Sequence, residues 1–512
     1  MTRLQNVLAR LERMSDSLSP IVVKEVRQLT RGREFHVSFG ISLLIGLAVA
    51  SLGAASALDG YGTSGGWTFS ALMVCLGILG LGVAPLGAFN ALRNERMEQT
   101  LELITLTSLS PRRVVIGKLL AQGIRLTTFF AGLAPFVATS FLLGGIDFTT
   151  IVVSMAILFM WSLWACAGCL FLSSLFKTRA MSGLLFGVVG VVLLLLLAVF
   201  GGSRIVYYVF YSAGMAPGPG GGGGATESWW TLAIMTTFWL ASLVNLVLLA
   251  ENRLSLPSEN RITPLRVGLF AQFLLTVIWS LTAIGGTIPT KWAAAAAIGI
   301  LCGIHLAFVA MFAVTEDLVL PRRVVLWMRR RPAWLRPFAM FLPGGGRGAV
   351  YVLAQMALLA IAAWLLDARE ASVPYVLVMC GYICFYTGVP AAALRLWRPF
   401  APASFLLRIA VVVLLALALL LPDIVVYMWA PSAFDGDFHT RHLINPIRTL
   451  GYWSHVNDLY GLAIPASMGL LGLFAYVALF FTGMRMTVPP VPIDPARTET
   501  PAGASRGADI VY

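Results

Sequence analysis

Long apolar runs separated by short polar segments dominate the chain. A helix that crosses a bilayer needs about 20 apolar residues, and twelve runs reach or approach that length. They lie at 36–58, 67–92, 119–145, 149–176, 181–201, 229–250, 266–288, 292–315, 349–366, 373–395, 404–430 and 459–483. The pattern predicts an all-α, polytopic integral membrane protein with about twelve transmembrane helices.

The composition agrees with a membrane protein and excludes a soluble globular one. Hydrophobic residues make up 58% of the 512 residues and charged residues only 12%, whereas a soluble domain carries roughly 25% charged residues. The net charge of +13 does not indicate nucleic-acid binding, because the basic residues lie in short loops between apolar runs. We therefore expect membrane lipid, and no nucleic acid, as the surroundings of this chain.

The distribution of Lys and Arg predicts the side of the membrane on which each loop lies. Of the 36 Lys and Arg residues, 29 fall in the N-terminal segment, in the alternate loops that follow it and in the tail. Five fall in the opposite loops, and Arg125 and Arg408 lie within predicted spans. Because cytoplasmic loops carry the excess of positive charge, both termini are expected in the cytoplasm, with the chain in the cell (inner) membrane.

Residues 1–35 precede the first span and are predicted to form cytoplasmic amphipathic helices. Pro20 follows a serine in a typical helix start signal. After it, apolar residues recur at helical spacing opposite a basic cluster that includes Lys24 and Arg27. Such a helix lies in the membrane interface, with its cations near anionic lipid.

The segment 94–118 is polar, yet its spacing indicates structure. Glu95, Glu98 and Glu102 share one helical face, and Ser110 is placed to cap a second helix that runs into the third span. A short helix in a tight hairpin between two membrane helices is well placed to transmit force. We therefore expect this segment to carry the function.

This segment resembles the coupling region of the permease subunits of ABC-2 type transporters. In that family, E-R-x-x-x-T-L-E and then T-x-L-S-x-x-x-[IV]-[LIV]-x-G-K lie between spans two and three, and P-[IL]-x-x-K-E-[LVF]-R precedes span one. The matching residues are Glu95, Arg96, Thr100, Leu101, Glu102, Thr107, Leu109, Ser110, Val115, Gly117 and Lys118, and, for the motif before span one, Pro20, Ile21, Lys24, Glu25, Val26 and Arg27. This chain departs from the family at 97–99, where many members have a glycine before the threonine.

The resemblance covers about residues 18–250 and implies a fold and partners. It implies a six-helix permease module at 36–250, in which 94–109 couples to a cytoplasmic ABC ATPase present in two copies. The chain would then be no enzyme and hold no cofactor, because ATP and Mg would bind the ATPase. Export is the expected direction, and the second permease half would come from a homodimer, another permease or this chain itself. The residues implied in coupling are Glu95, Arg96, Glu98, Thr100, Leu101, Glu102, Ser110, Gly117 and Lys118, beside the interfacial residues Pro20, Lys24, Glu25 and Arg27.

The second membrane module, 251–487, repeats the order of spans and long loops of the first. A shared pentapeptide, Pro-Arg-Arg-Val-Val, occurs at 111–115 and 321–325. Parallel repeats are a known transporter architecture, so two parallel six-helix repeats are predicted, the second degenerate. The alternative is six accessory spans on a permease that dimerises through its first half. The tail 488–512 is rich in Pro, Ala, Thr and Gly and is predicted to be disordered.

Two other classes of protein are alternatives to the permease. A membrane enzyme acting on lipid-linked substrates would need clustered carboxylates or histidines, and the one such cluster lies in the short external loop 431–458. A secondary transporter would need charges at the midplane of broken helices, where only His305 lies. No catalytic or metal-binding residue is predicted, and Cys166 and Cys169 are interpreted as packing residues.

The basic residues inside spans have a simpler interpretation. Arg125 and Arg408 lie near the inner interface, where long basic side chains extend along apolar surface to reach water. His305 is expected to be a hydrogen-bonded packing residue. The permease is favoured over the other two classes, and its substrate stays open.

Overall fold

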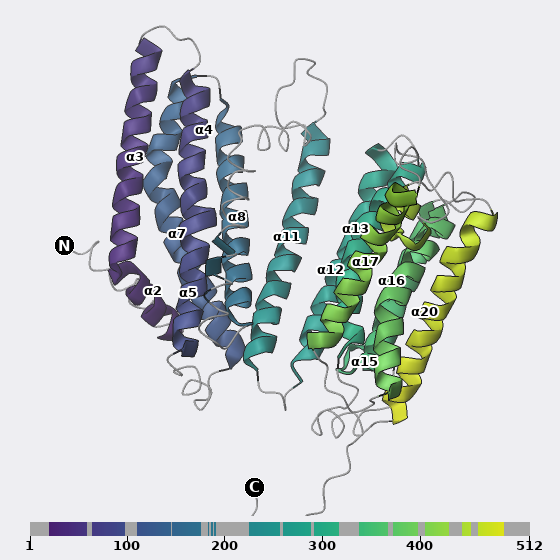
Figure 1. Ribbon diagram of the computed structural model, residues 1–512. Helices are drawn as coiled ribbons and strands as arrows, with labels where there is room; N and C mark the ends of the chain where they lie inside the picture. Colours follow the sequence, from purple (N-terminus) through teal and green to yellow (C-terminus); the bar gives the residue numbers. More distant parts are fainter. Residues whose placement is uncertain are drawn as a thin grey trace, which may run out of the picture. The chain divides into compact units, whose positions relative to one another are not determined.

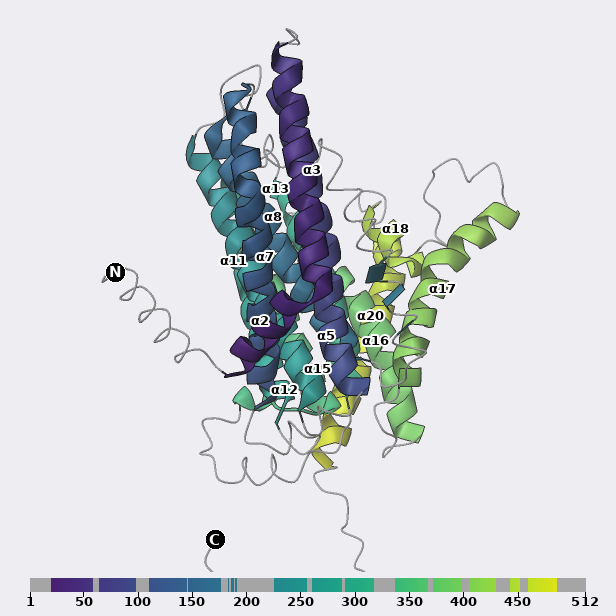
Figure 2. The same cartoon turned by 90° about the vertical axis from the view of Figure 1, so that its left-hand side faces the viewer.

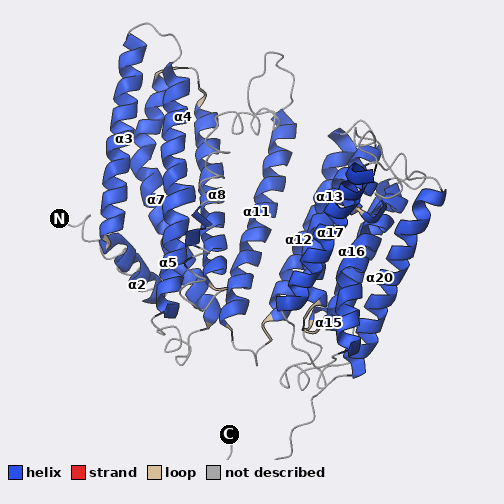
Figure 3. Cartoon of the chain, viewed as in Figure 1, coloured by secondary structure: helices blue, strands red, loops and turns tan. Residues whose placement is uncertain are grey.

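The computed structural model describes residues 20–58, 64–97, 110–144, 146–175, 183, 186–187, 189–190, 225–255, 260–287, 291–316, 337–366, 372–397, 405–429, 443–451 and 459–485. Within these residues the chain is helical and has no β-strand (Figure 3). The all-α prediction is confirmed for this part of the chain. The predictions for residues 1–19, for most of the fifth span and for the tail lie outside it.

Eight helical stretches in the described part are long and apolar enough to cross a membrane, which marks a multi-pass membrane protein. They are Arg33–Leu58, Gly65–Glu95, Pro111–Leu142, Phe148–Ser173, Ile262–Leu281, Gly345–Leu365, Val373–Leu396 and Leu462–Gly483. Two shorter apolar helices, Leu301–Val314 and Leu407–Pro422, lie in the same described part. The predicted membrane character is therefore confirmed, while the number twelve stays a prediction.

The chain divides into two compact units, residues 1–305 with 357–376, and residues 306–356 with 377–512. Along the chain the helices are α2 (Pro20–Arg31), α3 (Arg33–Leu58), α4 (Ser64–Gly77), η1 (Ile78–Val83), α5 (Ala84–Met97), α7 (Pro111–Leu142), α8 (Phe148–Ser173), α11 (Ala225–Leu254), α12 (Ile262–Thr287), α13 (Lys291–Val314), η3 (Pro337–Phe341), α15 (Gly345–Leu366), α16 (Ser372–Trp397), α17 (Phe405–Trp429), α18 (Pro446–Gly451) and α20 (Leu459–Arg485) (Figure 1).

In the first unit, α7 lies at the centre of the helix bundle. It packs against α2, α3, α4, α8 and α11. Its residues Leu126, Phe129 and Leu133 have no exposed surface, and the Phe129 ring lies 5.6 Å from that of Phe35 at the start of α3. The short helix α2 turns away from the axis of α3 and lies against α7 (Figure 2). The predicted amphipathic helix before the first span is therefore present and rests on the third span.

The second span contains a π-helical turn, in which the hydrogen bonds depart from the regular α-helical pattern. Helices α4, η1 and α5 follow one another without a break, and the Ala84 N–H bonds to the Leu79 carbonyl, five residues earlier. Pro85 follows directly and has no N–H to donate, so the preceding carbonyls cannot keep a regular α pattern. Gly80 in this turn packs on α8, where a β-carbon would lie 2.2 Å from the Ser162 hydroxyl oxygen.

Polar contacts connect the remaining helices of the first unit. The Trp239 ring N–H of α11 donates to the Met160 carbonyl of α8 at 2.7 Å. Asn245 of α11 donates its side-chain amide to Gln272 of α12 at 2.6 Å. Because hydrogen bonds between helices stabilise packing where hydrophobic driving force is weak, these contacts fix the neighbours α8, α11 and α12.

In the second unit, glycines bring two helices into backbone contact. A β-carbon on Gly381 of α16 would lie 3.0 Å from the Cα of Gly469 of α20. Beside this contact, the hydroxyls of Thr387 and Tyr476 lie 2.8 Å apart. The hydroxyl of Tyr386 donates to the carbonyl of Ile444, which precedes α18, at 2.6 Å. Helix α16 therefore holds both α20 and the start of α18.

Candidate functional site

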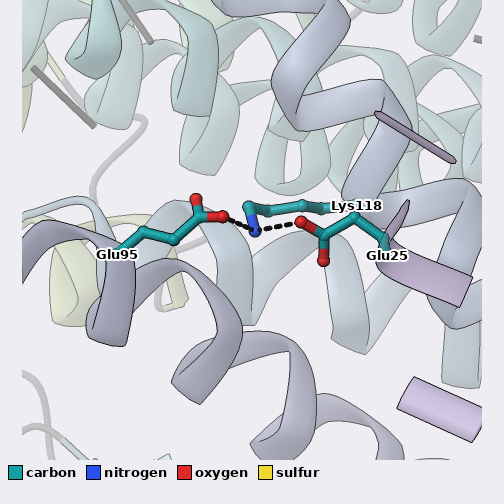
Figure 4. Close-up of polar contacts among 3 residues, drawn as sticks. All are labelled: Glu25, Glu95 and Lys118. Carbon is teal, nitrogen blue, oxygen red and sulfur yellow. Dashed lines mark hydrogen bonds and ion pairs between the residues drawn. The ribbon is translucent and has the colours of Figure 1, made fainter. Parts of the chain in front are cut away.

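Three elements of the first unit meet at one lysine. The Lys118 Nζ of α7 lies 2.9 Å from the Glu25 Oε1 of α2 and 2.9 Å from the Glu95 Oε1 of α5 (Figure 4). We call these three residues the Lys118 cluster. A cation between two carboxylates from separate helices fixes the positions of all three helices relative to one another.

The Lys118 cluster is shielded from solvent. The side chains of Lys118, Glu25 and Glu95 are 3%, 7% and 16% exposed. Burial weakens screening and strengthens each charge pair, but it also carries a large desolvation penalty. Such a cluster adds little net stability compared with apolar residues, whereas loss of one partner leaves a buried charge unpaired. The arrangement therefore specifies which helices come together more than it raises stability.

The residue at which α7 begins determines that Lys118 lies on the buried side of the helix. Ser110 has extended backbone angles and Pro111 occupies the first turn, as helix starts prefer. The Arg113 N–H bonds to the Ser110 carbonyl at 2.9 Å. Two turns later Lys118 joins Val114 and Val115 on the buried side. Ser110 thus occupies the predicted cap position, but its side chain forms no cap hydrogen bond.

Glu25 reaches the lysine because α2 is amphipathic and packs on α7. Val22 and Glu25 are 2% and 5% exposed, whereas Lys24 and Arg27 point to the exposed side. The apolar stripe and the basic face follow the sequence prediction. The burial of Glu25 does not follow from periodicity, because a carboxylate on the apolar side is explained only by the lysine across from it.

The predicted coupling residues have different outcomes. Glu95 and Lys118 are in direct contact, and Gly117 is buried beside the lysine. Arg96 lies in the last turn of α5. Residues 98–109 are outside the described part of the chain, so the roles predicted for Glu98, Thr100, Leu101 and Glu102 stay predictions.

Arg125 corrects the sequence interpretation. It was expected to extend toward water, but it is only 5% exposed and lies inside the bundle, with its guanidinium 5.5 Å from the centre of the Phe129 ring. Position along a helix gives the depth of a residue in the membrane, but not the direction of its side chain. Arg125 points toward α5 rather than along the outside of α7, since the space it fills is the space beside Gly87.

Two charged residues of the second unit bind backbone groups. The Arg395 guanidinium donates to the Glu316 carbonyl at 3.1 Å, and the Glu316 carboxylate accepts the Gly344 N–H at 3.0 Å. We call these the Glu316 contacts. Arg408 is half-buried and donates to the Thr315 hydroxyl at 3.1 Å. The expectation that Arg408 extends to water stays a prediction, and the side chain also binds the residue that follows α13.

His305 and the cysteines are buried or packed inside the helix bundles. The His305 ring lies 5.7 Å from that of Phe273, and its buried Nε2 has no hydrogen-bond partner. The ring packs against Phe273 as predicted, whereas no hydrogen bond to Nε2 is found within the described part of the chain. All six cysteines are buried and free. Within the part of the chain that the structure describes, no group of three His, Cys, Asp or Glu residues is placed to hold a metal ion.

The chain was compared with models of known protein families, with curated proteins and with solved structures, and none of the three comparisons found a match. A function for this chain therefore has to be inferred from its own residues. The Lys118 cluster is the strongest candidate, because it buries three charges and connects three separate elements.

Proposed function

We propose that this chain is the permease subunit of an ABC-2 type transporter, driven by a separate cytoplasmic ATPase. The Lys118 cluster is the observation that carries the proposal. Its residues come one each from the three motifs that resemble the family: Glu25 from the interfacial motif, Glu95 from E-R-x-x-x-T-L-E and Lys118 from the G-K ending. Residues that are 93 positions apart, such as Glu25 and Lys118, thus share one contact.

The cluster supports a mechanical role for the segment between its members. Residues 98–109 connect Glu95 to the start of α7, so the two ends of this segment are tied through the Lys118 pair. A displacement of the segment by a bound ATPase would act on α2, α5 and α7 together. The permease itself contributes no catalytic residue in this proposal, and ATP with Mg binds the partner, which is present in two copies.

The wider architecture belongs to the same proposal. It has twelve spans, with both termini on the cytoplasmic side of the cell (inner) membrane, and an exporting direction. The second module, 251–487, serves as a degenerate parallel repeat, or the permease pairs with a second copy or another permease. The 29 basic residues in the N-terminal segment, in the alternate loops and in the tail support this orientation.

A site-specific crosslink tests the partner. A photoreactive amino acid at Thr105, within the proposed coupling segment, should capture in native membranes a protein that carries a nucleotide-binding motif and hydrolyses ATP. The same amino acid at Gly221, which is predicted to lie on the opposite side of the membrane, is the matched control and should capture none. Mass spectrometry of the crosslinked product identifies the partner.

A pair of substitutions tests the coupling. Glu98→Ala with Glu102→Ala should leave membrane insertion unchanged, because exposed helix charges contribute only about 0–1 kcal/mol to stability. The same pair should reduce the crosslink at Thr105 at least tenfold, since it removes the acidic face proposed to bind the ATPase. The pair Arg329→Ala with Arg330→Ala tests whether the second module also couples to the ATPase. ATP hydrolysis by the purified chain alone, or capture of the same protein from both positions, would contradict the permease proposal.

A further inference from the structure

The polar face of α7 continues beyond Lys118. Gln122 and Arg125 follow at intervals of one turn and are 1% and 5% exposed. Their neighbours Leu126 and Phe129 on the same helix have no exposed surface. A buried amide and a buried guanidinium therefore lie within the apolar bundle, separate from the two carboxylates that bind Lys118.

Within the described part of the chain, each of these two side chains has a buried polar atom without a hydrogen-bond partner. The Arg125 Nε and the Gln122 Oε1 are buried without a hydrogen-bond partner, and the salt bridges found among the described residues involve Lys118 and not Arg125. The contact of the guanidinium with Phe129, at 5.5 Å, is a cation–π contact within one helix. Buried charges are normally paired with an opposite charge. The exposed Glu34 acts on Arg125 electrostatically but forms no ion pair with it.

Helix α5 leaves room for this guanidinium. A β-carbon at Gly87 would lie 2.5 Å from the Arg125 Nη1 and 4.0 Å from the Gln122 Oε1. The first distance is far too short and the second is an ordinary contact, so the glycine makes room for the Arg125 guanidinium beside Gln122. The π turn and Pro85 come just before Gly87. The two polar side chains and the glycine converge from two helices on one place.

We propose that Arg125 and Gln122, seated against Gly87, form an intramembrane subsite for the acid group of an amphiphilic molecule. The acid group is a phosphate or a carboxylate, because the planar guanidinium binds both with two parallel hydrogen bonds. A half-turn of the Gln122 side-chain amide exchanges its oxygen and nitrogen without changing its shape, and the amide then supplies an N–H donor. This subsite lies outside the proposed ATPase coupling and does not depend on it.

The source of the acid group is the membrane rather than the water. The core around Arg125 is apolar, with Leu126 and Phe129 fully buried. An amphiphile dissolved in the bilayer keeps its chain among apolar groups while its acid group neutralises the guanidinium. A free inorganic anion would have to leave water without that compensation.

Equilibrium dialysis with the purified full chain in a neutral maltoside detergent tests the proposal. Radiolabelled dodecyl phosphate should bind saturably, and dodecanoate should compete, whereas dodecanol and inorganic phosphate should not. Arg125→Met should weaken binding at least tenfold, and Arg125→Lys less, because it keeps the charge without the planar fork. Arg113→Met, on the exposed face of the same helix, is the matched control and should bind as the natural chain does.

A second readout separates loss of the site from loss of the fold. Arg125→Met removes an unpaired buried charge, so its melting temperature without ligand should equal or exceed that of the natural chain, and dodecyl phosphate should no longer raise it. Gly87→Ala keeps the charge and displaces the guanidinium, so it should also weaken binding. Equal binding by the natural chain and Arg125→Met, or an equal loss in Arg113→Met, would overturn the subsite. Saturation by inorganic phosphate alone would overturn the assignment to an amphiphile.

Discussion

The Lys118 cluster and the Glu316 contacts connect helix ends by different chemistry. In the first, one buried cation binds two carboxylates, so both contacts join charged side chains. In the second, Arg395 donates to a backbone carbonyl and Glu316 accepts a backbone N–H. A backbone group is present whatever the residue type, whereas a charge partner is not. The first arrangement therefore depends on three residue identities at once, whereas each of these two contacts of the second depends on one charged side chain.

This difference bears on the predicted repeat. A working second coupling site would be expected to use charged side chains as the first does. The described contacts at the ends of α13, α15 and α16 instead include side-chain bonds to backbone. The shared pentapeptide at 321–325 lies outside the described residues. The prediction of a degenerate second half stays a prediction.

The largest effect is expected from Lys118→Met. It leaves the carboxylates of Glu25 and Glu95 buried without their cation, and breaking a buried pair lowers the free energy of unfolding by about 3–5 kcal/mol. Reversible denaturation of the purified chain in mixed micelles measures this change. Arg112→Met, at an exposed position of the same helix, should change it by less than about 0.5 kcal/mol. If both variants unfold alike, the cluster does not specify the packing of these helices.

A smaller effect is expected in the second unit. Arg395→Met removes the donor to the Glu316 carbonyl, and hydrogen bonds that involve a charged group contribute about 1.5–3 kcal/mol. The same denaturation series measures the loss. Arg395→Lys, which keeps a donor, should recover part of it. A loss larger than that of Lys118→Met would reverse the ranking of the two regions.

The smallest effect is expected from Thr315→Val. The substitution keeps the shape of the side chain and removes the acceptor for the Arg408 guanidinium, which is half-buried and also lies 4.9 Å from the centre of the Phe312 ring. The retained ring contact limits the loss to about 1 kcal/mol. Thr482→Val, whose hydroxyl bonds only within its own helix at 2.7 Å, is the matched control. A loss above that of Arg395→Met would show that α17 is held mainly through this hydroxyl.

The spans could be predicted from the sequence because membrane helices are set by length and apolarity. The predicted span 36–58 corresponds to α3 at Arg33–Leu58, and 459–483 to α20 at Leu459–Arg485. The π turn in the second span was not predicted, because an apolar helix shows no periodicity that a local change could interrupt. Pro85, inside the predicted span, was the signal that could have revealed it.

The candidate site could be predicted only in parts. The motifs identified Glu25, Glu95 and Lys118 separately, through resemblance, but nothing in their spacing paired them. Their contact depends on how α2 and α5 pack on α7, which is a property of the folded bundle. Arg125 was misjudged for the same reason, because the partner surface at Gly87 lies on another helix.

The π turn has a consequence for the alignment of charges along the second span. A bond from Ala84 to Leu79, spanning five residues instead of four, accommodates one more residue than a regular turn. Each residue of an α-helix rotates the chain by about 100°. A regular helix without that extra residue would therefore carry Glu95 about a quarter of a turn around the axis of α5, away from Lys118. The one additional residue within 78–83 therefore rotates Glu95 into the position in which it pairs with Lys118.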